Sequence, residues 1–194
     1  RRRLLSAGAA ALAVGLAGCS EADGPDDTPR DPRGGPPEDA VTDFTTVSVR
    51  RDDPEPFVSL DIDDTSQGSV LFLVTSEERD ALVFDAEPPG TADARALIDG
   101  TDFESQTVAI VQRDLGACYR RYTEYVIPGD GEFEAEFCRI LRDADVPCER
   151  SSRDMVATFI RFPYAYDARP TSVSYGSGST CQSVHWETPT EGEQ

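Results

Sequence analysis

Short runs of apolar and β-branched residues recur between positions 43 and 187, and Gly, Pro, Asp or Ser residues separate each run from the next. Runs of this kind are typical of strands. The runs 69–75 and 107–113 are almost wholly apolar, which indicates central strands buried on both faces. The predicted strands are 43–51, 57–62, 69–75, 107–113, 119–127, 132–141, 155–162, 171–176 and 181–187.

Only two segments, 76–84 and 91–99, have the pattern of a helix. Ser76 and Thr91 are the expected N-caps, and acidic residues follow each of them in the first turn. A chain with many short strands and so few helices favours an antiparallel arrangement. We therefore predict an all-β, mainly antiparallel fold, which is a β-sandwich or barrel-like domain with one or two short helices.

Pro128 to Gly131 separate two predicted strands with a turn signal of the kind that closes a hairpin. A two-residue loop at 129–130 would place Val126 opposite Phe133 and Tyr122 opposite Phe137 on an apolar face. A bulge at the turn would move this register by one residue and exchange the two faces. In the predicted register Glu132, Glu134 and Glu136 lie on the solvent-exposed face.

The globular part of the chain contains four cysteines. An even number of cysteines outside the cell usually forms disulfides, and four allow three connectivities. In the predicted hairpin register, Cys118 shares the core face with Leu141 while Cys138 points to the other face. That arrangement favours Cys118–Cys148 with Cys138–Cys181 and leaves the other pairings open. A metal site is disfavoured, because the chain has no C-x-x-C pair and His185 is its single histidine.

Residues 1–18 combine three arginines with a fifteen-residue apolar run, which is too short to span a bilayer. They resemble a twin-arginine export signal, and the sequence up to Cys19 resembles a lipobox, in which this cysteine is lipidated. The resemblance implies a lipoprotein held at the outer face of the membrane. Because the chain starts without Met, we expect that its first residues are missing from the printed sequence.

The chain divides by composition into four parts. After the signal, residues 19–40 form an acidic linker rich in Pro and Gly, which we expect to be disordered. Residues 41–188 form a single domain stapled by disulfides, and residues 189–194 form a tail that we expect to be disordered.

Acidic residues dominate the charge of the chain, which has 37 Asp and Glu against 18 basic residues, all of them Arg. A nucleic-acid binder needs the opposite sign of charge, so this class of partner is excluded. The absence of Lys together with this acidity resembles haloarchaeal proteins, in which molar salt screens the repulsion between carboxylates. We expect a domain that is adapted to high salt.

The strongest catalytic candidate is the segment Asp61-Ile62-Asp63-Asp64-Thr65, which has the D-x-D-x-T spacing of haloacid-dehalogenase-type phosphatases. In that reading Asp61 is the nucleophile and Asp63 the acid/base partner. The predicted fold lacks the parallel sheet that this chemistry needs. A calcium loop fits no better, because Ser66 occupies the position that requires Gly. An exported metal-dependent phosphatase therefore stays as the alternative function.

The segments "TSEERDAL" and "LIDGTDFESQTVAIVQ" resemble the C-terminal-type domain of the protease-complex subunit PrcB, with Asp102-Phe103 and Val108 to Val111 carrying the match. The resemblance implies a small β-rich accessory module without catalytic residues or cofactors. The expected function is therefore non-enzymatic: an extracellular binding or accessory module that is anchored in the membrane by lipid at Cys19. Its expected partner is an envelope protein or a glycan.

Overall fold

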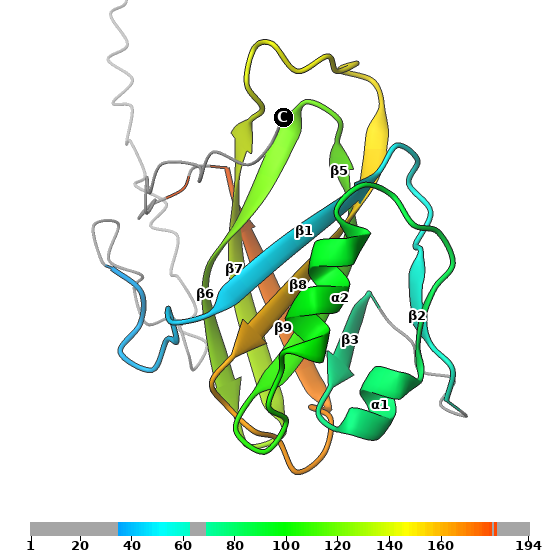
Figure 1. Cartoon of the computed structure of the whole chain (residues 1–194). Helices are drawn as coiled ribbons and strands as arrows, with labels where there is room; N and C mark the ends of the chain where they lie inside the picture. The colour runs from blue at the N-terminus through cyan, green and yellow to red at the C-terminus, as the bar shows by residue number, and fades with distance from the viewer. Residues whose placement is uncertain (1–34, 63–68, 180, 182–194) are drawn as a thin grey trace, which may run out of the picture. The chain divides into compact units, whose positions relative to one another are not determined.

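A computed structural model describes residues 35–62, 69–179 and 181. The described part contains nine strands and two short helices, and Figure 1 shows their arrangement. Their bounds are β1 Thr45–Arg51, β2 Val58–Leu60, β3 Val70–Leu73, α1 Ser76–Asp80, β4 Leu82–Phe84, α2 Thr91–Asp99, β5 Thr107–Gly116, β6 Tyr119–Gly129, β7 Glu132–Leu141, β8 Arg153–Phe162 and β9 Ser172–Gly178. Cys19, Asp63, His185 and the predicted strand after Cys181 lie outside the described residues.

The strands form two main sheets and one small one. The central sheet has the order β1-β8-β5-β3, and every neighbouring pair in it is antiparallel. A second sheet has the order β6-β7-β9, and a short pair joins β2 to β4. The pair β7–β9 is parallel and is the exception to the antiparallel pattern. The predicted all-β class is confirmed, and the form it takes is the sandwich rather than a closed barrel.

The central sheet is buried on both faces, as the apolar runs predict. Along β5, Val108 and Ile110 belong to one core cluster, together with buried residues of α2 and β2. Ala109 and Val111 point the other way and pack against β6 and β7 in a second cluster. Figure 1 shows α2 lying over one face of this sheet. The domain is therefore layered, and the space between the central sheet and the β6-β7-β9 sheet is the interior of the sandwich.

The hairpin β6–β7 forms as predicted, but its register is different. Val126 lies opposite Ala135 and Tyr122 lies opposite Cys138, because the loop consists of Asp130 and Gly131. Gly131 has a φ of 72°, a conformation that favours glycine in a tight turn. The pairing shifts again between Thr123 and Tyr125.

Burial in the hairpin also differs in part from the expectation. Phe133 and Phe137 lie in the core, whereas Tyr122 is 36% exposed and Leu141 is 67% exposed. Leu141 is therefore not part of the core face, although the sequence pattern placed it there. Apolar side chains of the hairpin are buried only where the central sheet covers them. The final residues of β7 extend beyond this covered part.

The first predicted helix is shorter than expected. It ends at Asp80, and Leu82–Phe84 form the strand β4 instead. Its N-cap is Thr75 rather than Ser76, because the Thr75 side chain accepts from the backbone of Glu78 in a capping box. The second helix keeps its predicted bounds, but Gly90 is its N-cap and Thr91 is its first helical residue.

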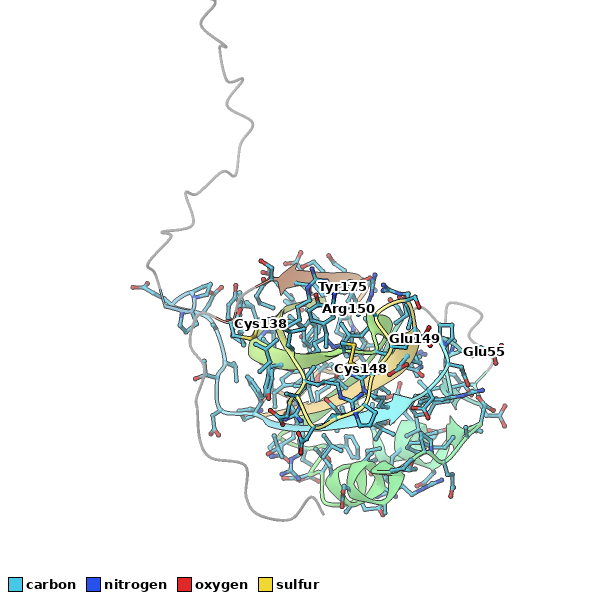
Figure 2. The ribbon with its side chains drawn as sticks, turned by 90° about the horizontal axis from the view of Figure 1, so that it is seen from above. Glu55, Cys138, Cys148, Glu149, Arg150 and Tyr175 are labelled. Atoms are coloured by element: carbon cyan, nitrogen blue, oxygen red, sulfur yellow. A yellow bond between two sulfur atoms is a disulfide. The ribbon has the colours of Figure 1, made fainter. Side chains whose placement is uncertain are left out.

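Two disulfides lie toward the end of the hairpin β6–β7 that is opposite its Asp130-Gly131 turn. Cys118 is bonded to Cys148 and Cys138 to Cys181, with Cα–Cα distances of 5.1 and 5.0 Å. This is the pairing that the sequence favours. Figure 2 labels Cys138 and Cys148, one from each bond, on separate parts of the ribbon.

Candidate functional site

The inner face of the central sheet changes from apolar to polar along its length. At the apolar end Ile160 and Ala109 are paired neighbours on β8 and β5 within the core. Four residues earlier on β8, Val156 lies between Arg50 of β1 and Arg113 of β5. Residues paired in this way point to the same face of a sheet. Two arginines therefore lie on the face of the central sheet that is turned toward the β6-β7-β9 sheet, Arg50 half-buried and Arg113 exposed.

A third arginine enters the same space from the opposite sheet. Arg121 of β6 donates from Nη2 to the backbone oxygens of Val111 and Val156, at 3.0 and 3.1 Å, and to Oγ1 of Thr158 at 2.8 Å. Its guanidinium also lies 4.9 Å from the centre of the Phe137 ring. Arg121 therefore bridges the two sheets at the point where the apolar core ends.

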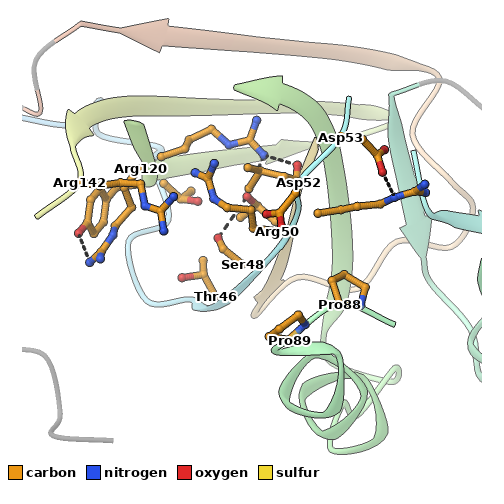
Figure 3. A pocket seen from close by; sticks show the side chains of 15 residues that line it. Thr46, Ser48, Arg50, Asp52, Asp53, Pro88, Pro89, Arg120 and Arg142 are labelled. Atoms are coloured by element: carbon orange, nitrogen blue, oxygen red, sulfur yellow. Dashed lines mark hydrogen bonds and ion pairs between the residues drawn. The ribbon is translucent and has the colours of Figure 1, made fainter. Parts of the chain in front are cut away.

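An open cleft of about 910 Å³ begins where the core ends. Figure 3 shows Arg120 and Arg142 near one end, Asp53 at the other, and Pro88 and Pro89 along one wall. Five arginines and two aspartates line the cleft, although acids outnumber bases two to one in the whole chain. The full lining is Thr46, Ser48, Arg50, Arg51, Asp52, Asp53, Pro88, Pro89, Arg120, Arg121, Tyr122, Thr123, Arg142, Val156 and Thr158.

Three of these arginines are neutralised by carboxylates. Arg50 pairs with the buried Asp154 at 2.6 Å. Arg51 pairs with Asp53 at 2.6 Å. The third pair is looser, with 3.6 Å between Arg120 and Asp143.

The other two arginines of the cleft have no carboxylate partner within the part of the chain that the structure describes. They are Arg121 and Arg142. Arg142 donates from Nη1 to the backbone oxygen of Ala117 at 3.1 Å, and its backbone N–H donates to Cys118. The Cys118–Cys148 disulfide thus anchors the segment that carries Arg142. Two guanidinium charges are available for a ligand in this cleft.

Burial, together with the positive charges of Arg113 and Arg50, lowers the pKa of Arg121 to about 10. The side chain remains a cation at neutral pH. Its Nε is buried without a hydrogen-bond acceptor, and so is Oγ1 of the neighbouring inward residue Thr123. Buried polar groups are normally satisfied, and an exception calls for an explanation. An anion in the cleft would supply the missing negative charge.

Asp61, the nucleophile of the phosphatase alternative, does not line the cleft, and its predicted partner Asp63 lies outside the described residues. Asp61 is exposed directly after β2, and its backbone N–H donates to Ala81. Among the residues that can be described, no group of three or more His, Cys, Asp or Glu side chains is placed to hold a metal ion. The described helices include none that is long and apolar enough to cross a membrane.

The arginines of the cleft are missing from the sequence prediction. The available signal is the contrast between an acidic chain and the adjacent pairs Arg50-Arg51 and Arg120-Arg121. The pairs lie far apart in the sequence, and only the register of β1, β8 and β5 with β6 brings them together.

No protein-family model matches the chain, and neither a curated protein nor a solved structure does. The geometry and charge of the cleft are the features that bear on function.

Proposed function

We propose that this protein is a binding module that is anchored by lipid at the outer face of the cell membrane and whose cleft binds an oxyanion. One observation carries the proposal: the cationic Arg121 lies buried in the cleft with no carboxylate beside it within the described structure. An anionic ligand would balance this buried charge. Arg142 lines the same cleft.

Guanidinium groups suit this role in brine. At molar salt the Debye length is only about 3 Å, so attraction at long range is screened. Direct contact persists, because guanidinium forms two parallel hydrogen bonds to a carboxylate, phosphate or sulfate group. An all-arginine, Lys-free set of cations therefore favours recognition by contact. The binding or accessory role also accords with the resemblance to PrcB-type domains.

Sulfate is a suitable probe for the site, and Arg142→Gln is the variant that tests it. In molar KCl we expect millimolar sulfate to raise the melting temperature of the wild-type protein, because a ligand that binds only the folded state stabilises it. The variant loses one of the two available cations, so this shift should fall at least by half. Differential scanning calorimetry measures both proteins.

Arg95→Gln is the matched control, because Arg95 lies on α2 outside the cleft and pairs with Glu87. It changes the net charge of the protein by the same amount. A sulfate response that is absent from the wild type, or equal in the two variants, rejects the cleft as an oxyanion site.

The anchoring proposal has its own test at Cys19. Two disulfides in the domain are typical of proteins outside the reducing cytosol, and the lipobox resemblance places the lipid on this cysteine. We expect Cys19→Ser to move the protein from the membrane fraction to the medium when it is expressed in a haloarchaeal host. Immunoblots of both fractions measure the change. A variant that stays in the membrane fraction contradicts lipidation at this position.

A further inference from the structure

The strand β9 lies at the edge of the β6-β7-β9 sheet. It pairs with β7 on one side over Ser172–Gly178, in a register without a bulge. The backbone N–H of Ser172 donates to Gly131 on that side at 3.1 Å, so every second residue from Val173 onward points its N–H and C=O to the other side. Among the described residues, no backbone group pairs with β9 there. Such a row of N–H and C=O groups is a template for another strand.

The other three edges of the two main sheets differ from β9. β3 has only four residues. β1 ends in Arg50 and Arg51, and β6 carries charged side chains and is bridged by Val41 at Val126. Short length, charge and coverage are the features that keep sheet edges from pairing. By contrast, β9 has seven residues, and the sequence from Pro170 to Val184 contains no Asp, Glu, Lys or Arg, although 28% of the chain is charged.

Two large side chains of β9, Val173 and Tyr175, are partly exposed beside this edge. Their partners on β7 belong to the core, so both point toward the central sheet. They nevertheless remain 38% and 37% exposed. Arg113 of β5 holds the Tyr175 ring in place, with its guanidinium 4.7 Å from the ring centre. A further strand beside β9 would cover both side chains and bury apolar surface.

The sequence of β9 is complementary to itself in the antiparallel direction. A two-fold axis at Tyr175 would place this residue opposite Tyr175 of a second copy. Val173 would then lie opposite Ser177, and Ser174 opposite Gly176, so that no two bulky side chains other than the tyrosines meet. Both copies would use the same surface, as a two-fold interface requires, and two three-stranded sheets would become one continuous sheet.

Charge favours β9 as the place where two copies meet. Each chain carries a net charge of −19, and the repulsion between two chains is weakest where the facing residues are uncharged. Glu136 of β7 is a nearby acid, because its carboxylate reaches over β9 to the position that a Cβ on Gly176 would occupy. At molar salt the Debye length of about 3 Å screens the repulsion between the two copies of this carboxylate.

We propose that two copies of this chain pair antiparallel along β9 and form a dimer in molar salt. The proposal does not involve the cleft, so its failure leaves the oxyanion site standing. A dimer would bring together two of the lipid anchors proposed at Cys19, and two lipid chains hold a protein at a membrane better than one.

Sedimentation equilibrium in molar KCl tests the proposal. All samples are the full chain with Cys19→Ser, so that neither a lipid nor the thiol of this residue links two chains. Because the interface is small, we expect a weak dimer with a dissociation constant on the order of 10 μM. A protein that stays monomeric up to about 500 μM overturns the proposal.

Val173→Lys tests whether the dimer uses β9. A lysine on an edge strand opposes pairing, so we expect the dissociation constant to rise at least about tenfold. Val83→Lys is the matched control, because Val83 is also 38% exposed on a strand but belongs to β4. It should leave the dissociation constant unchanged. Equal constants in the two variants overturn the assignment to β9.

Tyr175→Cys tests the register of the pairing. Residues directly opposite each other in an antiparallel pair have Cα atoms about 5.5 Å apart or less, which a disulfide can bridge. Under mild oxidation in molar KCl we expect this variant to form a covalent dimer, seen on non-reducing electrophoresis. Ser172→Cys is the control, since an axis at Tyr175 places its two copies about 20 Å apart. If Tyr175→Cys gives no covalent dimer, or no more of it than Ser172→Cys, pairing around Tyr175 is wrong.

Discussion

Replacing Arg121 with methionine should leave the free energy of unfolding of the ligand-free domain within about 1 kcal/mol of wild type. Burial and the nearby charges of Arg113 and Arg50 together disfavour this cation by about 3 kcal/mol, as the fall of its pKa from 12.5 to about 10 indicates. The two N–H groups of Nη2 share three acceptors, and at about 1 kcal/mol for each N–H they offset most of that cost. The same substitution should abolish the stabilisation by sulfate. Urea unfolding in molar KCl, with and without sulfate, measures both effects.

Arg50→Met gives the contrast. Arg50 pairs with the buried Asp154, so its loss leaves a carboxylate without a partner and should cost about 3 kcal/mol or more. If Arg121→Met proves as costly as Arg50→Met and keeps its response to sulfate, Arg121 is a structural residue and the binding account of the cleft is wrong.

Transfer from molar KCl to dilute buffer should unfold the domain. From Cys19 onward the chain has 15 arginines against 37 acidic residues, a net charge of −22, since the first eighteen residues contain three arginines and no acid. Dilute buffer no longer screens the mutual repulsion of these carboxylates, and the Debye length grows from about 3 Å at 1 M to about 30 Å at 0.01 M. Far-UV circular dichroism across a KCl series should show a loss of strand signal below about molar salt.

A variant with fewer negative charges tests whether repulsion is the cause. Glu104, Asp145 and Asp167 are exposed, and replacing all three with lysine removes three acids and adds three cations. The salt concentration at half-unfolding should fall, and the corresponding Gln and Asn substitutions should give about half the effect. A melting temperature that is the same in low and high salt would remove the claim of adaptation to brine.

The strands were predictable because their side-chain pattern is local. The run from Thr107 to Arg113 reads as buried on both faces from its composition alone, and the structure places it in the middle of a two-sided sheet. The strand Leu82–Phe84 was misread as the end of a helix. Three residues are too few to show an alternation, and the pairing with β2 decides their conformation.

Neither the register of the hairpin nor the existence of the cleft could be predicted, and the physical reason is the same. A shift of one residue at Gly131 exchanges partners along the whole of β7, and nothing in Pro128-Gly129-Asp130-Gly131 distinguishes the two loops. Arg50, Arg113 and Arg121 come together only once four strands are aligned. The disulfide pairing could be predicted with less information about the fold, because it depends on which end of the hairpin each cysteine occupies.

Whether an oxyanion enters between the two sheets is decided by the Nε–H resonances of the arginines, followed by ¹⁵N NMR while sulfate is added in molar KCl. Binding at the cleft predicts saturable shifts of the Arg121 and Arg142 signals and a constant Arg95 signal. If the Arg121 signal does not move, or moves no more than that of Arg95, no anion pairs with the buried Arg121 cation and the proposed site does not exist.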